Sequence, residues 1–184
     1  MKPPATLVDK ISPDTVPPKF LKITNTKITN ASGFNIFTRY YNMEVKNSVL
    51  ARAGQYAVAL TRGGGYRFLQ TTIANYWGGG QRSTPSVYLN DYGLDQNGNA
   101  QQFPLYQADF DNCILWGDND EELELDFEFG TTSHRFRNVL IKTKSNSSSS
   151  PCGLFFFTFF DKSESAIAMY SLYCFLFFMT LNFI

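Results

Sequence analysis

Apolar and polar residues follow one six-residue pattern that returns five times along this chain of 184 residues. The pattern is an apolar residue, any residue, Asn or Gln, a small residue, any residue, and then Ile or Leu, with a looser fifth copy. A repeat of about 20 to 30 residues is typical of a solenoid. The amides are 22, 23, 42 and 26 residues apart, at Asn25, Asn47, Gln70, Asn112 and Asn138.

A second short apolar segment follows the amide in each of the first four units. It begins nine residues after Asn25 and Asn47, 17 after Gln70 and 11 after Asn112. Short, alternating segments separated by Gly and Asn favour strands over helices. We therefore predict an all-β chain that forms a single-stranded, right-handed parallel β-helix of about four to five turns.

The predicted β-helix covers residues 21–146 and follows a Pro-rich N-terminal segment, 1–20. Successive turns would lie about 4.8 Å apart. The amides would occupy the corners, because a short amide side chain tolerates left-handed backbone and can bond the neighbouring turn. We expect them to stack as a structural ladder, with a small residue after each one pointing into the core.

Four segments carry a likeness to known proteins: 54–60, 72–77, 84–89 and 110–117. With them, residues 21–144 resemble the right-handed parallel β-helix repeat proteins of the pectin-lyase-like superfamily, closest to secreted or surface members from Bacteroidetes. The resemblance implies an extracytoplasmic or cell-surface location. The fold hosts lyases, hydrolases and adhesins alike, so the resemblance alone does not select an activity.

Both ends of the chain differ from that family. The N-terminal segment contains no apolar run of seven residues, so it does not read as a signal peptide, and we expect the chain to be a fragment of a longer repeat. Residues 147–184 comprise a Ser-rich linker and an unrelated apolar tail, in which 165–184 carry no charge. Two interpretations stay open for the tail: a membrane anchor, which that length allows, or a run-on that is not native to the domain.

Composition narrows the functional classes. Sixteen basic and sixteen acidic residues give a net charge of zero, so nothing indicates a nucleic-acid partner. The single His134 excludes a multi-His metal site, and the three Cys have no metal-like spacing. The segment 95–99 has only a faint likeness to a Ca²⁺ loop and lacks the downstream Glu. We expect no cofactor, with Ca²⁺ kept as an open alternative.

Acidic residues concentrate in one stretch, 109–128, which holds nine acids and no base. Within it, residues 123–129 alternate strictly between apolar and acidic. Alternation along a strand predicts that the two Leu and two Phe face the core while Glu124, Asp126 and Glu128 face outward.

Register then predicts the neighbours of these carboxylates. If Phe34, Tyr56, Val87 and Leu123 stack inward, two outer rows follow: Asn35, Ala57, Tyr88, Glu124 and Phe37, Ala59, Asn90, Asp126. The candidate ligand-binding residues are therefore Tyr88, Asn90, Glu124 and Asp126, beside a loop with Tyr76 and Trp77. Aromatic rings next to carboxylates and amides suit a sugar. Tyr76 and Trp77 would either cover the core or form part of the sugar platform.

Three functional hypotheses follow for this surface. The first is a non-enzymatic module that binds carbohydrate or a cell-surface protein. The second is a polysaccharide lyase or glycoside hydrolase of the pectin-lyase-like type, in which paired carboxylates act on a glycosidic bond; no Arg of a neighbouring turn is clearly placed on the acidic face to serve as its base. The third is a structural spacer or inactive fragment with a solvated acidic face. A membrane would be a partner only if 165–184 are an anchor.

Overall fold

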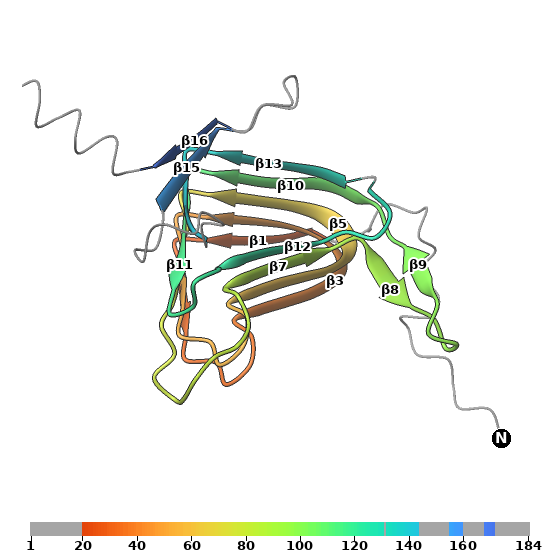
Figure 1. Ribbon diagram of the computed structural model, residues 1–184, viewed down its shortest axis with the longest axis horizontal. Coiled ribbons are helices and arrows are strands. Elements are labelled where there is room, and N and C mark those ends of the chain that lie inside the picture. The colour runs from red at the N-terminus through yellow and green to blue at the C-terminus, as the bar shows by residue number, and fades with distance from the viewer. Residues whose placement is uncertain (1–19, 131, 144–154, 160–167, 172–184) are drawn as a thin grey trace, which may run out of the picture.

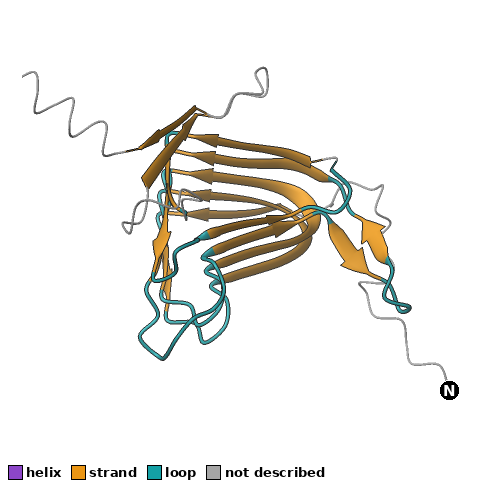
Figure 2. Cartoon of the chain, viewed as in Figure 1, coloured by secondary structure: helices purple, strands orange, loops and turns teal. Residues whose placement is uncertain are grey.

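The protein is all-β in the computed structural model, which describes residues 20–130, 132–143, 155–159 and 168–171. Every regular element in these ranges is a strand, and most neighbouring strands are parallel (Figure 1, Figure 2). The predicted all-β class is confirmed. Among the described residues there is no helix that is long and apolar enough to cross a membrane.

Two seven-stranded sheets and one hairpin make up the structure. The first sheet contains β1 (Phe20–Thr24), β3 (Ile36–Lys46), β5 (Val58–Leu69), β7 (Val87–Asn90), β10 (Leu105–Asp111), β12 (Leu123–Asp126) and β13 (Thr132–Arg137). The second contains β2 (Lys27–Thr29), β4 (Val49–Ala51), β6 (Thr72–Asn75), β11 (Ile114–Gly117), β14 (Val139–Lys142), β15 (Phe155–Phe159) and β16 (Ala168–Ser171). The hairpin is β8 (Tyr92–Leu94) with β9 (Ala100–Gln102).

The first sheet divides into two halves because its long strands bend. β3 bends at Tyr40, and β5 bends at Arg62, Gly63 and Gly64, all of which have positive φ. Before the bends, β3 pairs with β5, β5 with β7, and β7 with β12. After the bends, β3 pairs with β1 and with β5, β5 pairs with β10, and β10 pairs with β13. We call these parts the β12 half and the β13 half (Figure 1).

The core consists of rows in which each repeat adds one inward side chain. Ile28, Leu50, Ile73, Leu115 and Ile141 form such a row across the second sheet. On the β13 half, Val45 is followed by the stacked rings of Phe68, Phe110 and Phe136, whose centroids lie 4.7 and 5.1 Å apart. These residues are buried or packed against the buried cluster. Equivalent positions of the repeats therefore meet in space.

The repeated amides lie at the corner between the β13 half and the second sheet. Asn25, Asn47, Gln70, Asn112 and Asn138 all have φ between 47° and 54°. Nδ2 of Asn47 donates to Oδ1 of Asn25 at 2.7 Å, and Nδ2 of Asn138 donates to Oδ1 of Asn112 at 3.1 Å. The next residue is buried in four of the five repeats: Ser48, Thr71, Cys113 and Val139.

The last repeat corrects one expectation from the alternation. All four apolar residues of 123–129 were expected in the core, but Leu125 and Phe129 are each 38% exposed, and the strand ends at Asp126. Leu123 and Phe127 do pack against the core. The cause is position, because β12 pairs with β7 alone, so no further described strand covers its outer edge.

Part of the predicted apolar tail forms two strands that extend the second sheet beyond β14. β15 pairs antiparallel with β14, and β16 pairs antiparallel with β15. The other residues of 147–184, and residues 1–19 of the Pro-rich segment, lie outside the described residues.

The corner amides generate a stability prediction. Asn47→Ala should lower the free energy of unfolding by about 1–2 kcal/mol, because Ala is strained at φ 47° and lacks the short amide that lets Asn tolerate left-handed backbone. Asn47→Gly relieves that strain and should cost less. Urea unfolding of the two variants measures the difference. Equal losses would show that the side-chain bond to Asn25, and not the backbone conformation, makes the contribution.

Candidate functional site

The outer surface of the β12 half carries the candidate site, but its register differs from the expected one. The aligned inward row is Ile36, Val58, Val87 and Leu123. The first outer row is Phe37, Ala59, Tyr88 and Glu124, and the second is Arg39, Thr61, Asn90 and Asp126. The predicted pairing of Tyr88 and Glu124 with Asn35 and Ala57 was wrong, as was that of Asn90 and Asp126 with Phe37 and Ala59.

A bend just before each strand explains the error. Backbone bonds from Val58 N to Ser86 O and from Val87 N to Glu122 O align the residues that precede the strands. Ala57 and Val58 are both completely buried, as are Ser86 and Val87, so two consecutive side chains point inward at the bend. Strict alternation therefore fails there.

The same bend moves two aromatic residues to the surface. Phe34 and Tyr56, both expected in the core, lie outside, and Phe34 is 37% exposed. Their rings stack at 5.9 Å with an interplanar angle of only 7°. Each stands nine residues after its corner Asn. That shared offset is the sequence signal that could have identified them as a surface pair.

These rings belong to a continuous aromatic strip, which we define as Phe34, Phe37, Tyr56 and Tyr88. The Phe37 ring lies 5.0 Å from that of Phe34, and the Tyr88 ring lies 5.3 Å from that of Tyr56. Ala59 is only 1% exposed although it belongs to the first outer row, whereas Phe37 is 46% exposed. The strip thus crosses the strands of three successive repeats.

Asp126 accepts hydrogen bonds from two phenol hydroxyls at the end of the strip. The hydroxyl of Tyr88 donates to its Oδ2 at 2.6 Å, and the hydroxyl of Tyr92 donates to the same oxygen at 2.8 Å. Asn90 supports the arrangement from beneath: its Nδ2 donates to the Tyr88 hydroxyl, and its Oδ1 accepts from the backbone N–H of Arg62. Asn90 therefore positions Tyr88 and also provides a hydrogen-bond acceptor for the backbone N–H of Arg62 at the bend of β5.

The electrostatics of the cluster keep its phenols protonated. Burial and the hydrogen bond to Asp126 raise the pKa of Tyr88, and the bond to Asp126 is the main cause that raises the pKa of Tyr92. Partial burial, followed by the charge of Glu124, raises the pKa of Tyr56. The pKa of Glu124 is itself raised, first by partial burial and then by the carboxylates of Asp126 and Glu121.

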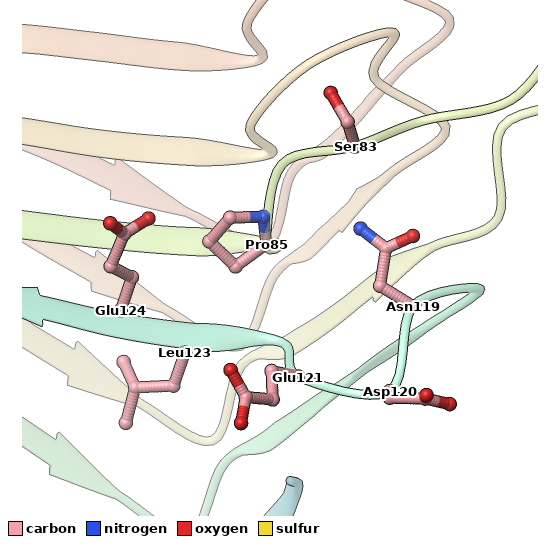
Figure 3. A pocket seen from close by; sticks show the side chains of 7 residues that line it. All are labelled: Ser83, Pro85, Asn119, Asp120, Glu121, Leu123 and Glu124. Atoms are coloured by element: carbon pink, nitrogen blue, oxygen red, sulfur yellow. The ribbon is translucent and has the colours of Figure 1, made fainter. Parts of the chain in front are cut away.

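A hollow of about 480 Å³ adjoins the strip at Glu124, which lies opposite Tyr88 in the strand register. Figure 3 shows Glu124 on β12 close to Pro85, which precedes β7. The lining residues come from the loops before β7 and β12 and from β12 itself: Ser83, Pro85, Asn119, Asp120, Glu121, Leu123 and Glu124. An aromatic surface thereby leads into an acidic, partly enclosed end.

A buried ion pair holds the loops on both sides of the hollow. Nη2 of Arg82 lies 2.6 Å from Oε1 of Glu122, and both side chains are completely buried. Arg82 also donates to the backbone oxygens of Asn75 and Thr84, while Glu122 accepts from the hydroxyl of Ser86 and the backbone N–H of Asn119. Glu122, although part of the acidic stretch, is thus structural and does not face solvent.

Tyr76 and Trp77, the two loop candidates, take different places. Tyr76 is 49% exposed, and the half-buried Trp77 packs beside Gly54 and Gly79. The backbone N–H of Trp77 donates to Oδ2 of Asp118, which follows β11. The described hydrogen bonds and ring contacts join neither residue to the cluster of Tyr88, Asn90, Glu124 and Asp126, which lies together on one surface.

Metal and thiol chemistry find little support in the residues described. No three His, Cys, Asp or Glu side chains in this part of the chain are grouped to hold a metal ion. Cys113 lies in the core, where burial raises the pKa of its thiol to about 11. A thiol of that pKa is a poor nucleophile at neutral pH.

Comparisons with known proteins add no assignment. No protein-family model matches the chain, no curated protein matches it, and no solved structure matches its fold.

The buried pair predicts a large mutational effect. Arg82→Leu leaves the Glu122 carboxylate buried without its cation, so the free energy of unfolding should fall by about 3–5 kcal/mol. Arg67→Leu is the matched control, because Arg67 is half exposed in its pair with Glu44 and should cost no more than about 1 kcal/mol. Urea unfolding measures both; equal losses would contradict the structural role of the buried pair.

The raised pKa of Glu124 predicts a pH-dependent gain in stability. Because folding disfavours its charged form, Glu124→Gln should raise the melting temperature at pH 7. The gain should shrink as the pH falls through the raised pKa and vanish well below 4.5, the ordinary value. Glu124→Asp keeps the charge and should show little gain. Thermal unfolding between pH 3 and pH 8 (roughly the range in which carboxylates titrate) would refute this if the gain were independent of pH.

Proposed function

We propose that this chain is a right-handed parallel β-helix module that acts outside the cytoplasm and binds an extended carbohydrate along the aromatic strip. The sequence repeat and the parallel pairing of equivalent strands support the β-helix. From β4 to β14, the chain visits the β12 half, the β13 half and the second sheet in the same order in each repeat. The resemblance of 54–60 and 84–89 to pectin-lyase-like proteins supports the location.

The aromatic strip is the observation that carries the carbohydrate proposal. Sugars present apolar ring faces that pack on aromatic side chains, and their hydroxyls need polar neighbours. Phe34, Tyr56 and Tyr88 supply rings 5.9 and 5.3 Å apart, one from each of three repeats. That interval is similar to the length of one sugar unit in an extended chain. A glycan would therefore lie across the strands, parallel to the direction in which the repeats stack.

The proton states of the cluster favour binding over catalysis. A phenol that acts as a general base must be unprotonated near neutral pH, so that it can accept a proton. The phenols of Tyr88 and Tyr92 instead have raised pKa values and donate to Asp126. They act as fixed polar contacts.

Glycan binding should depend on the strip and not on exposed aromatic residues in general. Tyr56→Ala should weaken binding about tenfold, the factor that corresponds to about 1.4 kcal/mol, which is near the upper end for one aromatic contact. Tyr76→Ala removes an exposed ring outside the strip and should leave binding unchanged. A glycan array identifies the ligand, and titration calorimetry on the full chain compares the variants.

Two outcomes would contradict the proposal. One is a wild-type chain that binds no glycan on the array. The other is equal weakening by Tyr56→Ala and Tyr76→Ala, which would place the glycan away from the strip.

A further inference from the structure

We infer that the glycan is uncharged or amine-bearing and that acidic glycans are rejected, because the polar end of the strip presents hydrogen-bond acceptors. This inference rests on the proposed function and names the class of carbohydrate. It departs from the uronate polymers that the pectin-lyase-like resemblance would suggest.

The hydroxyl protons of Tyr88 and Tyr92 are both used in hydrogen bonds within the protein. Tyr88 and Tyr92 both donate to Oδ2 of Asp126, at 2.6 and 2.8 Å. A phenol has one proton, so the oxygens of Tyr88 and Tyr92 can offer a ligand only lone pairs. The oxygen of Tyr88 already accepts one bond from Nδ2 of Asn90.

The amides near the strip are engaged as well. Oδ1 of Asn90 accepts from the backbone N–H of Arg62 at 2.7 Å, and the residue is largely buried. Nδ2 of Asn119, on the rim of the hollow, donates to the backbone oxygen of Thr84 at 2.6 Å. Ser83 contributes a hydroxyl that can donate or accept. The other polar groups in the hollow are the carboxylates of Asp120, Glu121 and Glu124, which only accept when ionised.

The described cations near these acceptors are engaged elsewhere. The guanidinium of Arg62 lies 5.6 Å from the centre of the Phe103 ring, and Nζ of Lys142 donates to the backbone oxygen of Gly117 at 3.0 Å. Arg39 lies three strand spacings from Asp126, with β5 and β7 between them, which is about 14 Å at the usual strand spacing. Its guanidinium lies 5.1 Å from the centre of the Phe37 ring, at the opposite end of the strip. Arg82 is buried against Glu122. A ligand carboxylate near Tyr88 would therefore meet the carboxylates of Glu124 and Asp126, while the guanidinium of Arg62 is held over Phe103. Sugar hydroxyls or ammonium groups would instead find acceptors.

Matched glycans that differ only in charge test the inference. The probes are polygalacturonate with its fully methyl-esterified form, and a β-1,4-glucan hexamer with its C6-oxidised form. In each pair that binds, the uncharged member should bind the wild-type chain about tenfold more tightly or better. Because screening weakens charge repulsion, added salt should narrow the ratio. Titration calorimetry on the full chain gives all four affinities.

Two variants locate the discrimination. Asp126→Asn replaces one carboxylate oxygen with an N–H donor and removes a charge. Glu124→Gln does the same beside the strip. Each should reduce the preference for the uncharged member several-fold. Glu124→Gln keeps the test open if Asp126→Asn does not fold. Lys46→Gln, on the β13 half, is the control and should leave the ratio unchanged.

The outcomes separate this inference from the proposed function. Equal or tighter binding of the acidic member overturns the inference but leaves glycan binding on the strip in place. Discrimination that survives both Asp126→Asn and Glu124→Gln also overturns it. Failure of all four probes to bind counts against the carbohydrate proposal itself and removes the basis of the inference.

Discussion

Parallel backbone pairing between one repeat and the next fixes every outer surface of this protein. The parallel strands bond equivalent strands of the neighbouring repeats, so equivalent residues form rows across the two large sheets. Residues with positive φ keep this register at the corners, because they turn the chain at the same point in each repeat. Aromatic residues at two neighbouring positions of the repeat, one shared by Phe34 and Tyr56 and the other by Phe37 and Tyr88, are thereby joined into one strip.

The surface strip depends on buried polar groups as much as on its own rings. Arg82 and Glu122 hold the loops before β7 and β12, and these loops place Pro85 and Glu121 beside the strip. The side chain of Asn90 is largely buried. It accepts a hydrogen bond from the backbone N–H of Arg62, in the bend of β5, and donates one to the hydroxyl of Tyr88. Burying charge in this way gives little net stability, but it fixes the geometry of the loops around the hollow.

Sequence reasoning reached the strand class and the corner positions because both depend on local chemistry. Five amides at the same position of the six-residue pattern imply repeated left-handed corners, and the structure has positive φ at each of them. The outer rows were misassigned because alternation assumes a straight strand, and the bend places Ala57 and Val58 inward together. The Arg82–Glu122 pair joins residues 40 positions apart, so no local pattern announces it.

The acidic stretch 109–128 shows why a count of charges misleads about function. Asp109 and Asp111 pair with Arg135 and Arg137 of the next strand, and Glu122 is buried with Arg82. Asp126 accepts hydrogen bonds from the hydroxyls of Tyr88 and Tyr92. The carboxylates that face the hollow, Asp120, Glu121 and Glu124, are thus a minority of the nine acids. Strand register, and not acidic composition, decides which of these charges a ligand would meet.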